Sequence, residues 1–527
     1  MDAKAFVAKW KGCSLKERSA SQEHFIDLCR LLGQETPAQA DPRGEWFCFE
    51  RGVKKTGGGD GWADVWRKRC FAWEYKGKHK DLNAAFVQLQ RYAIALENPP
   101  LLVVSDMDTI IIRTNFTNTV METHTIALDE IGTQENLAKL RWLFTQPDKL
   151  RPGLTTADVT AEVATAFADL AKKLRGDAPY SHAQKHDPHR VAHFLNKLLF
   201  CLFAEDIGIL PDGLLTRLLD NSRSNPESLQ RMLKSLFATM TTGGEFGVEV
   251  IDWFNGGLFD GDDALPLDTD DIARLSSVAK AKWDAISPSL FGTLFERGLD
   301  PSKRSQLGAH YTDPESIMRI VDPVIVERLA GEWEAKKNSI QCGIAAWEAG
   351  KDSLKKSARD TAARKFKEAQ AAYRSFLLRL RDFRVLDPAC GSGNFLYLAL
   401  QSLKDFEQRV MLDAENMGLE RGFPEVGPQC VMGIELNDYA AELARVTIWI
   451  GEIQWMLRHG FNLSKNPILK RLDQIACRDA VLNADGTEAE WPKCDAIIGN
   501  PPFLGAKRMR ADLGDGYTDQ LRKCYEG

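Results

Sequence analysis

The sequence lacks the features that mark a secreted or membrane-embedded protein. Its eleven cysteines are scattered and form no Cys-x-x-Cys pair, which excludes a disulfide framework and a zinc ribbon and is typical of a reduced, cytosolic protein. The first residues, Met1 to Lys4, contain no apolar signal region. The most apolar window, Phe194 to Leu210, is short and interrupted by charges, which predicts a core helix rather than a membrane span. We therefore expect a cytoplasmic protein with no membrane partner.

An excess of positive charge is also lacking. The formal net charge is −6, and this balance gives no support for nucleic-acid binding, although the local distribution of charge matters more than the sum. The chain of 527 residues is long enough for about three domains.

One stretch with a clear pattern is Arg384 to Leu400, an apolar run followed by a tight turn of small residues and a helical pattern. Its central residues are Asp387, Pro388, Ala389, Gly391, Gly393, Asn394 and Phe395. The glycines let the backbone approach a ligand, and the helix start offers unpaired N–H groups. The absence of a following Lys-Ser or Lys-Thr excludes a P-loop. Such a turn alone could bind NAD, a phosphate or nothing, but Asp387 favours a cationic or amine-bearing ligand.

A second pattern follows about a hundred residues later. Cys494 to Ile498 is a buried type of strand that stops at Asn500-Pro501-Pro502-Phe503. Neither proline can donate a ladder hydrogen bond, so a rigid turn is expected at the carboxyl end of the sheet, where open α/β sheets bind ligands. An amide and an aromatic ring held there suit a flat base that carries an amine.

Together the two patterns resemble the S-adenosylmethionine-dependent DNA adenine-N6 methyltransferases. The resemblance implies that the cofactor-binding residues are Tyr311, Thr312, Asp387, Pro388, Ala389, Gly391, Gly393, Asn394, Phe395, Glu435 and Asp479. Glu435 would bind the ribose hydroxyls and Asp479 the adenine amine, and Tyr311 and Thr312 would close over the methionine end. The catalytic residues would be Asn500, Pro501, Pro502 and Phe503.

The mechanism that the resemblance implies is based on positioning. The target adenine is flipped out of the duplex and stacks on Phe503. Asn500 and the carbonyl of Pro501 accept hydrogen bonds from its N6 amine, whose lone pair attacks the sulfonium methyl in line.

A third pattern lies near the amino end. In an extended segment, Phe71, Trp73 and Tyr75 would point to one side and Glu74 and Lys76 to the other. An aspartate from the preceding strand, Asp64, would bring a second carboxylate to that side. Two carboxylates and a lysine can hold Mg2+ through oxygen and activate a water against a phosphate.

This pattern resembles the PD-(D/E)xK nuclease core. The resemblance implies that Asp64, Glu74 and Lys76 are catalytic, and that Asp64 and Glu74 bind Mg2+. A helix from Asp81 to Leu96 would carry Gln88 and Tyr92 on one face, as in one branch of that fold. The alternative is an ordinary solvated Glu-x-Lys pair on an exposed strand.

Periodicity predicts the remaining elements. We expect helices over residues 10–34, within 120–150, throughout 155–300 and over the charged stretch 329–381, with strands over 101–104 and 110–113. Asp187-Pro188 is a helix start. The histidines at 182, 186, 189 and 193 are interpreted as surface residues rather than a metal site. The basic residues between Lys355 and Lys367 could contact DNA phosphates or belong to a solvated helical hairpin.

The plan as a whole resembles the type IIL (MmeI-like) restriction–modification enzymes. The stretches that carry this likeness are Trp73–Ala85, Glu97–Asp106 and Ser305–Thr312. The predicted fold class is α/β, with a nuclease-like domain (1–152), an all-helical connector (153–300) and a Rossmann-like methyltransferase domain (301–527) with a charged helical insertion (329–381). The implied function is site-specific DNA adenine methylation joined to a Mg2+-dependent endonuclease, in restriction–modification or phage defence.

Only twenty-four residues follow Phe503, too few to finish such a sheet. We therefore expect an incomplete sheet with an unpaired edge. The partner would be double-stranded DNA, with target recognition in a missing part or a second chain. Two alternatives are a defence methyltransferase with an inactive nuclease region and a non-catalytic DNA-binding subunit that needs a separate recognition chain.

Overall fold

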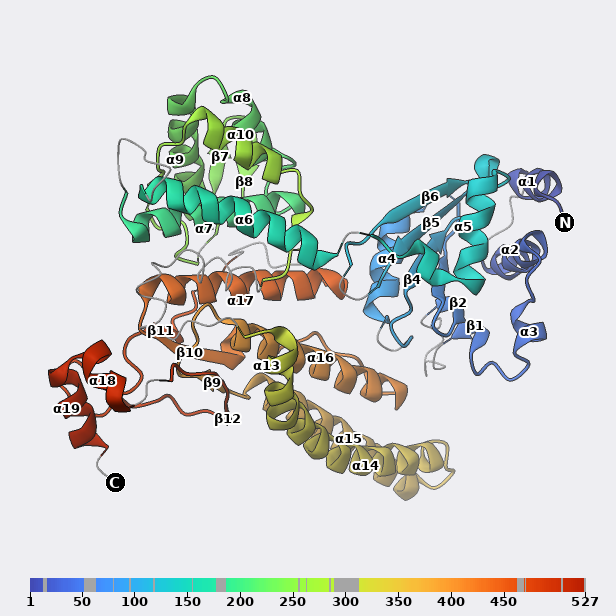
Figure 1. The fold of residues 1–527 in the computed structure, drawn as a ribbon. Helices are drawn as coiled ribbons and strands as arrows, with labels where there is room; N and C mark the ends of the chain where they lie inside the picture. Colours follow the sequence, from blue (N-terminus) through green and yellow to red (C-terminus); the bar gives the residue numbers. More distant parts are fainter. Residues whose placement is uncertain are drawn as a thin grey trace. The chain divides into compact units, whose positions relative to one another are not determined.

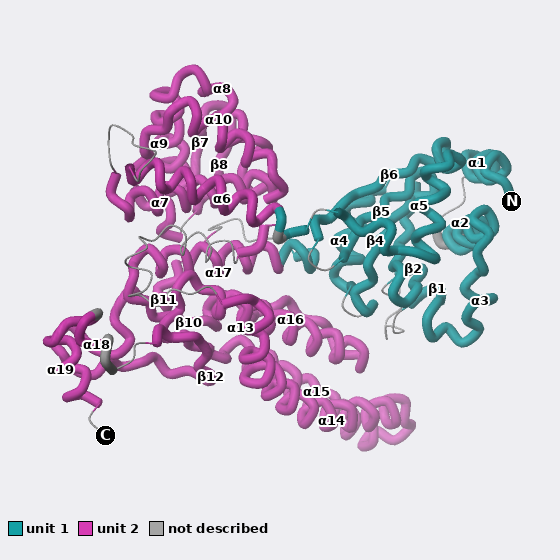
Figure 2. Tube along the Cα trace, viewed as in Figure 1, with its two compact units in different colours: residues 1–158, 456–462 teal, residues 159–455, 463–527 magenta. Residues whose placement is uncertain are grey.

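The structure, a computed structural model, divides into two compact units (Figures 1 and 2). Unit 1 comprises Met1–Asp158 and Met456–Asn462, and unit 2 comprises Val159–Trp455 and Leu463–Gly527. The residues described are 1–12, 17–51, 63–78, 80–93, 96–116, 119–153, 155–176, 186–254, 256–261, 263–283, 286–288, 312–461, 469, 471–503 and 506–525.

Unit 1 contains a six-stranded sheet in the order β1-β2-β3-β4-β5-β6. The strands are β1 (Phe47–Arg51), β2 (Ala63–Arg67), β3 (Phe71–Tyr75), β4 (Leu101–Ser105), β5 (Thr109–Thr114) and β6 (Thr123–Ala127). Strands β3 and β4 are parallel and are connected through helix α4 (Leu82–Arg91), whereas the other neighbours are antiparallel. The strands predicted over 101–104 and 110–113 are confirmed as β4 and β5.

The two faces of β3 enter different cores. Phe71, Trp73 and Tyr75 pack in one cluster with residues of α1 (Ala3–Lys11), α2 (Glu17–Leu32) and α5 (Gln134–Thr145). Ala72 packs in the other cluster with α4. The predicted alternation of side chains along this strand is therefore confirmed, and the helix expected over 10–34 is two helices.

The helix predicted within 120–150 is confirmed as α5, but the stretch does not begin as a helix, and the predicted end of helix α4 is wrong. The stretch 120–150 begins with strand β6, which pairs with β5 at the sheet edge; an edge strand buries few of its side chains, so its apolar pattern is weak. Helix α4 ends at Arg91 rather than Leu96, and Tyr92 is its C-cap. The chain must reverse there toward β4, and Glu97 and Asn98 take the left-handed conformation in that turn.

Unit 2 begins with helices. They are α6 (Thr156–Arg175), which starts just before the boundary, α7 (Pro188–Asp206), α8 (Leu214–Asn221), α9 (Pro226–Thr242) and α10 (Thr269–Val278). Asp187 caps α7 as predicted, because its carboxylate accepts from the backbone N–H groups of His189 and Arg190 at 3.0 and 3.2 Å. Helix α7 is buried along nearly its whole length, which confirms the predicted core helix. No helix among the described residues is long and apolar enough to cross a membrane.

The expectation of helices throughout 155–300 is wrong at one hairpin. Strands β7 (Gly244–Phe246) and β8 (Glu249–Ile251) pair antiparallel directly after α9. Gly243, with φ of 72°, ends that helix, and Val248 and Val250 are exposed, so the segment carries no apolar periodicity that would predict strands.

The second sheet of unit 2 is parallel, in the order β11-β10-β9-β12. Its strands are β9 (Val385–Asp387), β10 (Val431–Glu435), β11 (Ile475–Cys477) and β12 (Ala496–Ile497). Helix α16 (Asn394–Asn416) follows β9, and α17 (Asp438–Arg458) follows β10 (Figure 1). The remaining helices are α13 (Pro314–Val321), α14 (Glu327–Gly350), α15 (Lys356–Arg381), α18 (Ala506–Leu513) and α19 (Asp515–Cys524). The hairpin α14–α15 confirms the helices predicted over 329–381.

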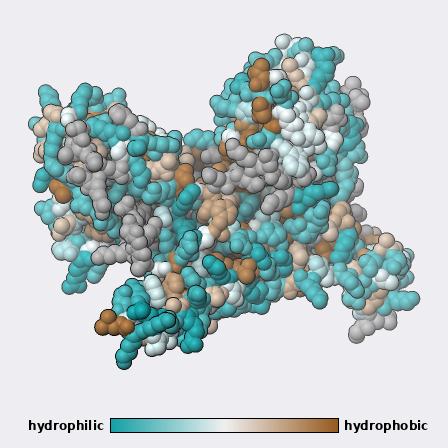
Figure 3. All heavy atoms as spheres, turned by 180° about the vertical axis from the view of Figure 1, so that it is seen from behind, coloured by the Kyte–Doolittle hydropathy of each residue, from teal (hydrophilic) through white to brown (hydrophobic). Residues whose placement is uncertain are grey.

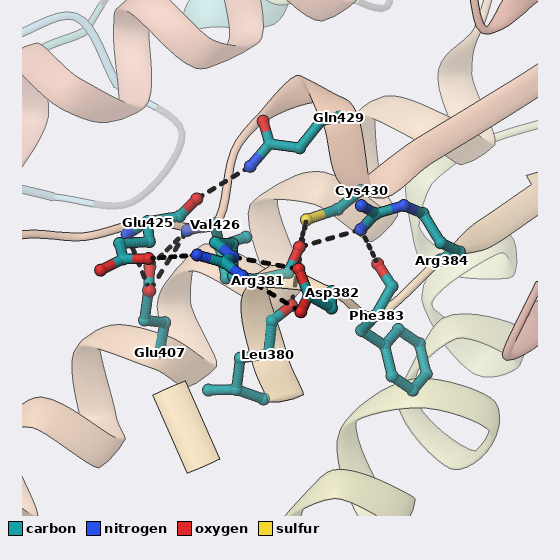
Figure 4. A network of polar contacts seen from close by, with 10 residues as sticks. All are labelled: Leu380, Arg381, Asp382, Phe383, Arg384, Glu407, Glu425, Val426, Gln429 and Cys430. Atoms are coloured by element: carbon teal, nitrogen blue, oxygen red, sulfur yellow. Dashed lines mark hydrogen bonds and ion pairs between the residues drawn. The ribbon is translucent and has the colours of Figure 1, made fainter. Parts of the chain in front are cut away.

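A polar network fastens the loop before β10 to the segment that enters β9 (Figure 4). Glu407 of α16 accepts from the backbone N–H groups of Glu425 and Val426, at 2.9 and 3.2 Å, and burial raises its pKa to about 7. The Arg381 guanidinium donates to Glu425 Oε2 at 3.4 Å, and the Cys430 thiol donates to the Arg381 carbonyl at 3.2 Å. The amino ends of the two central strands are thus held, which leaves their carboxyl ends to form a site.

Candidate active site

The carboxyl ends of the four parallel strands meet at one edge of the second sheet, as they do in open α/β folds. The predicted cofactor residues from 387 to 395, Glu435, Asp479 and the Asn500 turn all lie at or directly after these ends. Thr312 reaches the same edge through a contact with Asn500. Tyr311 lies outside the described residues.

The turn after β9 has the shape that its glycines suggested. Gly391 and Gly393 take φ of 51° and 85°, and Gly393 is the N-cap of α16. A Cβ at Gly393 would lie 2.9 Å from the Cα of Ala444, so the start of α16 packs directly on α17. Phe395, in the first turn of α16, is buried. Glycine is therefore required at 393 by both conformation and space.

Glu435 holds this turn against the end of β10. Its Oε2 accepts from the Gly391 N–H at 2.9 Å, and its Oε1 accepts from the Asn437 N–H at 2.9 Å. Burial raises the pKa of this carboxyl. Glu435 was expected to contact ribose hydroxyls. The structure adds a second role, which is to hold the backbone of the turn after β9. Each carboxylate oxygen has one backbone partner and can still accept a further hydrogen bond.

Asp387 is the most unusual group at this edge. Its side chain is buried, and Oδ1 accepts from the Ala389 N–H at 3.0 Å. Its Oδ2 is buried and has no hydrogen-bond partner among the described residues, a condition that native proteins rarely leave without a reason. Burial, and then the nearby charge of Glu435, raise its pKa to about 7. Asn394 Oδ1 is a second buried oxygen in this turn without a partner.

Gly499 connects the two motifs and was missed in the sequence. It has φ of 151°, and a Cβ there would lie 2.5 Å from Asp387 Oδ1. The end of β12 therefore passes directly against the Asp387 carboxyl. The signal was present as a glycine just before the Asn-Pro-Pro turn, but the contact is between residues more than a hundred positions apart.

The Asn500 turn projects from the surface. Asn500, Pro501, Pro502 and Phe503 are all exposed, and the Phe503 side chain is 100% exposed. The Asn500 Nδ2 donates to Thr312 Oγ1 at 3.3 Å, and its Oδ1 accepts no hydrogen bond from a described residue. Thr312, expected to contact cofactor, thus binds the amide nitrogen and leaves the amide oxygen without a donor among the described residues.

Asp479 is fixed by its own loop and by a distant helix. Its Oδ1 accepts from the N–H groups of Val481 and Leu482 at 2.7 and 3.2 Å. Its Oδ2 accepts from the hydroxyl of Tyr517 on α19 at 2.8 Å, and burial together with this carboxylate raises the pKa of Tyr517. Tyr517 was also missed, and no local pattern in the sequence indicates it.

Unit 1 brings the third predicted group together. The register that pairs Val65 with Trp73 puts Asp64 opposite Glu74, and Asp64 Oδ2 accepts from the Tyr75 N–H at 2.6 Å. Lys76 Nζ lies 2.8 Å from Glu74 Oε1.

Helix α4 supplies a fourth member of this group. Gln88 Nε2 donates to Glu74 Oε1 at 3.1 Å, and Lys76 Nζ donates to Gln88 Oε1 at 3.4 Å. The Glu74 side chain is only 8% exposed, which contradicts the interpretation as a solvated pair. Tyr92 lies past the end of the helix.

The histidines pair with carboxylates of α17. His189 Nδ1 lies 3.0 Å from Asp438, and His193 Nδ1 lies 2.8 Å from Glu442; His182 is outside the described residues. Within the described ranges, no group of three or more His, Cys, Asp or Glu side chains could hold a metal ion. A metal at Asp64 and Glu74 would therefore have two protein carboxylates.

Two parts of the chain match known domains. Residues 363–522 match the family model described as MmeI, DNA-methyltransferase domain. Residues 189–259 match the model described as MmeI, helicase spacer domain. The first of these matches makes the carboxyl-terminal part of unit 2 similar to a DNA-methyltransferase domain. The second match is to another domain of the same family, so two separate stretches of the chain are similar to domains of MmeI.

Curated relatives are longer than this chain. DNA methyltransferase A of Bacillus subtilis is 25% identical over 351 residues, covering 60% of this chain and 34% of the relative. A putative type II restriction enzyme and methyltransferase of Methanocaldococcus jannaschii is 25% identical over 301 residues, covering 49% and 24%. The chain thus spans about a third or less of these relatives. A solved DNA complex of the type IIL restriction–modification enzyme MmeI is 24% identical, with a TM-score of 0.49 over 67% of this chain and 45% of that one.

Proposed function

We propose that unit 2 transfers a methyl group from S-adenosylmethionine to the N6 amine of adenine in duplex DNA. The observation that carries this proposal is the Asp387 carboxyl. Its buried Oδ2 lacks a protein donor, and the same side chain packs on Gly499, directly before the Asn500 turn. The Asp387 carboxyl, which can accept from an amine-bearing cofactor, is therefore next to the Asn500 turn, which can hold a base.

The residues fit the cofactor. When bound, S-adenosylmethionine supplies an electrophilic methyl group on its sulfonium. Asp387 accepts a hydrogen bond from an ammonium group, which would satisfy its unpartnered oxygen. Glu435 accepts from ribose hydroxyls, and Asp479 accepts from an adenine amine. The small residues Ala389, Gly391 and Gly393 leave the backbone accessible.

The residues at the Asn500 turn fit a flipped base. Phe503 offers both faces of a fully exposed ring for stacking, a contact that contributes about 1–3 kcal/mol per base. Asn500 Oδ1, with its amide fixed by Thr312, accepts from an exocyclic amine. A hydrogen bond to that amine orients its lone pair, so catalysis is by positioning.

The test is transfer of labelled methyl from S-adenosylmethionine to duplex DNA by the full chain. Asn500→Ala should reduce transfer roughly 100-fold, the usual effect of removing one oriented amide group, while cofactor affinity stays unchanged. Asn338→Ala, at an exposed position of α14, is the matched control. Transfer that survives Asn500→Ala would contradict the assignment. Activity that appears only after a second chain is added would instead indicate a subunit that depends on a recognition partner.

We propose a second activity for unit 1, Mg2+-dependent hydrolysis of DNA phosphodiesters, because Glu74 is shielded from solvent and grouped with Lys76 and Gln88. Mg2+ usually binds through one or two carboxylates, with waters and substrate phosphate completing its shell, and Asp64 and Glu74 fit that need. The metal would lower the pKa of an attacking water, and Lys76 would stabilise charge on the phosphate.

This activity is tested by Mg2+-dependent cleavage of unmodified duplex DNA. Asp64→Asn, Glu74→Gln and Lys76→Gln should each abolish cleavage without reducing methyl transfer. Glu135→Gln, which removes an exposed ion-paired carboxylate on α5, is the matched control. If cleavage is absent in the parent protein and none of these variants changes its behaviour toward DNA, unit 1 is a scaffold or a remnant.

A further inference from the structure

The α14–α15 hairpin is a closely packed arm. A Cβ at Gly343 would lie 3.2 Å from the Cβ of Ala369, and one at Gly350 would lie 2.8 Å from the Cβ of Ala362. The two helices therefore approach closely through small residues. Near the far end, the rings of Trp347 and Phe366 have centroids 4.4 Å apart. Such packing leaves little freedom for the helices to separate.

The base of the hairpin is fixed to the methyltransferase sheet. Trp333 Nε1 donates to Asp413 Oδ2 on α16 at 2.8 Å, and Lys337 pairs with the same carboxylate at 2.8 Å. Arg379 pairs with Asp495, just before β12, at 2.8 Å. Whatever binds the arm is therefore connected rigidly to the strand that leads into the Asn500 turn.

The basic residues of the arm fall into two groups. In the first group each cation has a carboxylate partner: Arg364 and Lys365 pair with Glu368, and Lys351 pairs with Glu348. The second group consists of exposed cations on α15 that form no ion pair with a described residue: Lys356, Arg359, Lys367 and Arg374. Arg359 donates only to a backbone carbonyl, that of Ser353.

The second group lies on one face of α15. The positions 356, 359, 367 and 374 are separated by three, eight and seven residues. At 3.6 residues per turn these spacings are close to one, two and two helical turns, so the four side chains leave the helix on the same side. At 1.5 Å per residue the row is about 27 Å long. The other residues on this face are Ala363, Gln370 and one exposed carboxylate, Asp360, which lies one turn after Lys356. We call these four cations the α15 basic row.

We propose that the α15 basic row binds the phosphate backbone of DNA. This inference rests on the proposed action on duplex DNA and assigns a part of the molecule that holds the duplex. Four cations without carboxylate partners stand here in a chain of net charge −6. A DNA strand presents phosphates along a comparable length, and neutralising them releases counterions.

The chemistry of the row favours a phosphate backbone over a protein partner. The centre of a protein interface is rich in aromatic and other large apolar residues, and the face between Lys356 and Arg374 has none. Seen from behind, the outer end of the hairpin is largely hydrophilic with one isolated hydrophobic group (Figure 3). Contacts to phosphates carry no sequence information, so the proposed contact is independent of sequence.

The test uses the full chain and measures duplex binding across a series of salt concentrations. Changing Lys356, Arg359, Lys367 and Arg374 together to Gln should reduce the slope of log affinity against log salt by about three to four. The matched control changes four cations of unit 2 that already have carboxylate partners, Lys172, Arg217, Arg319 and Arg471, to Gln. It alters the net charge equally and should change the slope by less than one.

Three further readouts separate the possible failures. Thermal unfolding of both quadruple variants should match the parent, since all the changes are at helix or loop surfaces; the single variant Lys367→Glu provides a milder test if the first variant does not fold. Cofactor binding by calorimetry should be unchanged by the row variant. The proposal for the α15 basic row would be contradicted if the row variant and its control had equal slopes of log affinity against log salt. It would also be contradicted if the parent protein did not bind the duplex. Absence of cofactor binding by the parent would overturn the methyltransferase proposal and leave the slope comparison valid.

Discussion

The carboxylates of the two units differ in how their charge is compensated. In unit 1, Glu74 is in contact with Lys76 and Gln88, and Asp64 accepts from a backbone N–H. In unit 2, Asp387 is buried with one oxygen that has no donor among the described residues. A site whose carboxylates already have protein donors can lose its ligand at little cost to the fold. A site with an unmatched buried carboxyl is stabilised when a ligand supplies the missing donor.

The largest change in stability is expected at the glycine turn after β9 in unit 2. Gly393→Ala must place a Cβ 2.9 Å from the Ala444 backbone at a φ of 85°, and should lower the free energy of unfolding by about 3 kcal/mol. Gly391→Ala, also at positive φ but with open space around it, should lose about 1 kcal/mol. Denaturant unfolding and cofactor calorimetry measure both. Equal losses at the two positions would mean that the contact with α17 is unimportant.

In unit 1 the change Glu74→Gln should destabilise the protein by about 1 to 2 kcal/mol, because it removes the partner of a half-buried lysine. Thermal or denaturant unfolding at neutral pH measures this loss. Glu135→Gln, which breaks an exposed pair, should change stability by less than about 0.5 kcal/mol. A neutral or stabilising Glu74→Gln would remove the contrast between the units, since its carboxylate would then behave as an unmatched charge.

The effect of Asp387 on the pH dependence of folding stability should be opposite in sign to the effect of an ordinary salt-bridged carboxylate. The pKa of Asp387 is raised to about 7, so the folded protein binds more protons than the unfolded chain between about pH 4 and 7. Stability without cofactor must therefore fall as pH rises through this window. Glu407 and Glu435, whose pKa values burial also raises, act in the same direction. Asp387→Asn should flatten part of the slope in unfolding experiments and abolish cofactor binding; an unchanged slope would contradict the unmatched state of Asp387.

The smallest expected effect concerns Tyr517→Phe. This change removes the hydrogen bond from the Tyr517 hydroxyl to Asp479 Oδ2 and should lower stability by about 1 kcal/mol. If that bond positions Asp479 for an adenine amine, cofactor affinity should fall several-fold while the pH profile stays unchanged. Tyr525→Phe, which removes a bond from the other end of α19 to the Val481 carbonyl, is the control. Equal losses of affinity would indicate that α19 acts only as a structural support.

The sequence predicted the parts of both sites that depend on local pattern. The glycine turn after β9, the Asn-Pro-Pro-Phe turn, and the alternation that places Glu74 and Lys76 on one face each lie within a few residues, where backbone geometry follows from residue type. Gly499 against Asp387, Tyr517 against Asp479 and Thr312 against Asn500 bring together residues separated by 38 to 188 positions. No periodicity records such contacts, because they arise only when the strands take their order in the sheet.

The mispredicted elements have two physical causes. Strand β6 is at a sheet edge, and β7 and β8 form a small exposed hairpin, so neither buries enough side chains to impose an apolar alternation. Helix α4 ends early because the chain must reverse before β4, a tertiary demand that overrides the helical pattern continuing to Leu96.

The bare ring of Phe503 has a practical consequence for handling the protein. An aromatic side chain that is 100% exposed can stack on a base. It can equally stack on the Phe503 ring of a second molecule of the protein. At high protein concentration and without nucleic acid, the protein should therefore tend to self-associate or aggregate through the Asn500–Phe503 turn. A short duplex, or a planar aromatic additive, should act as a solubiliser.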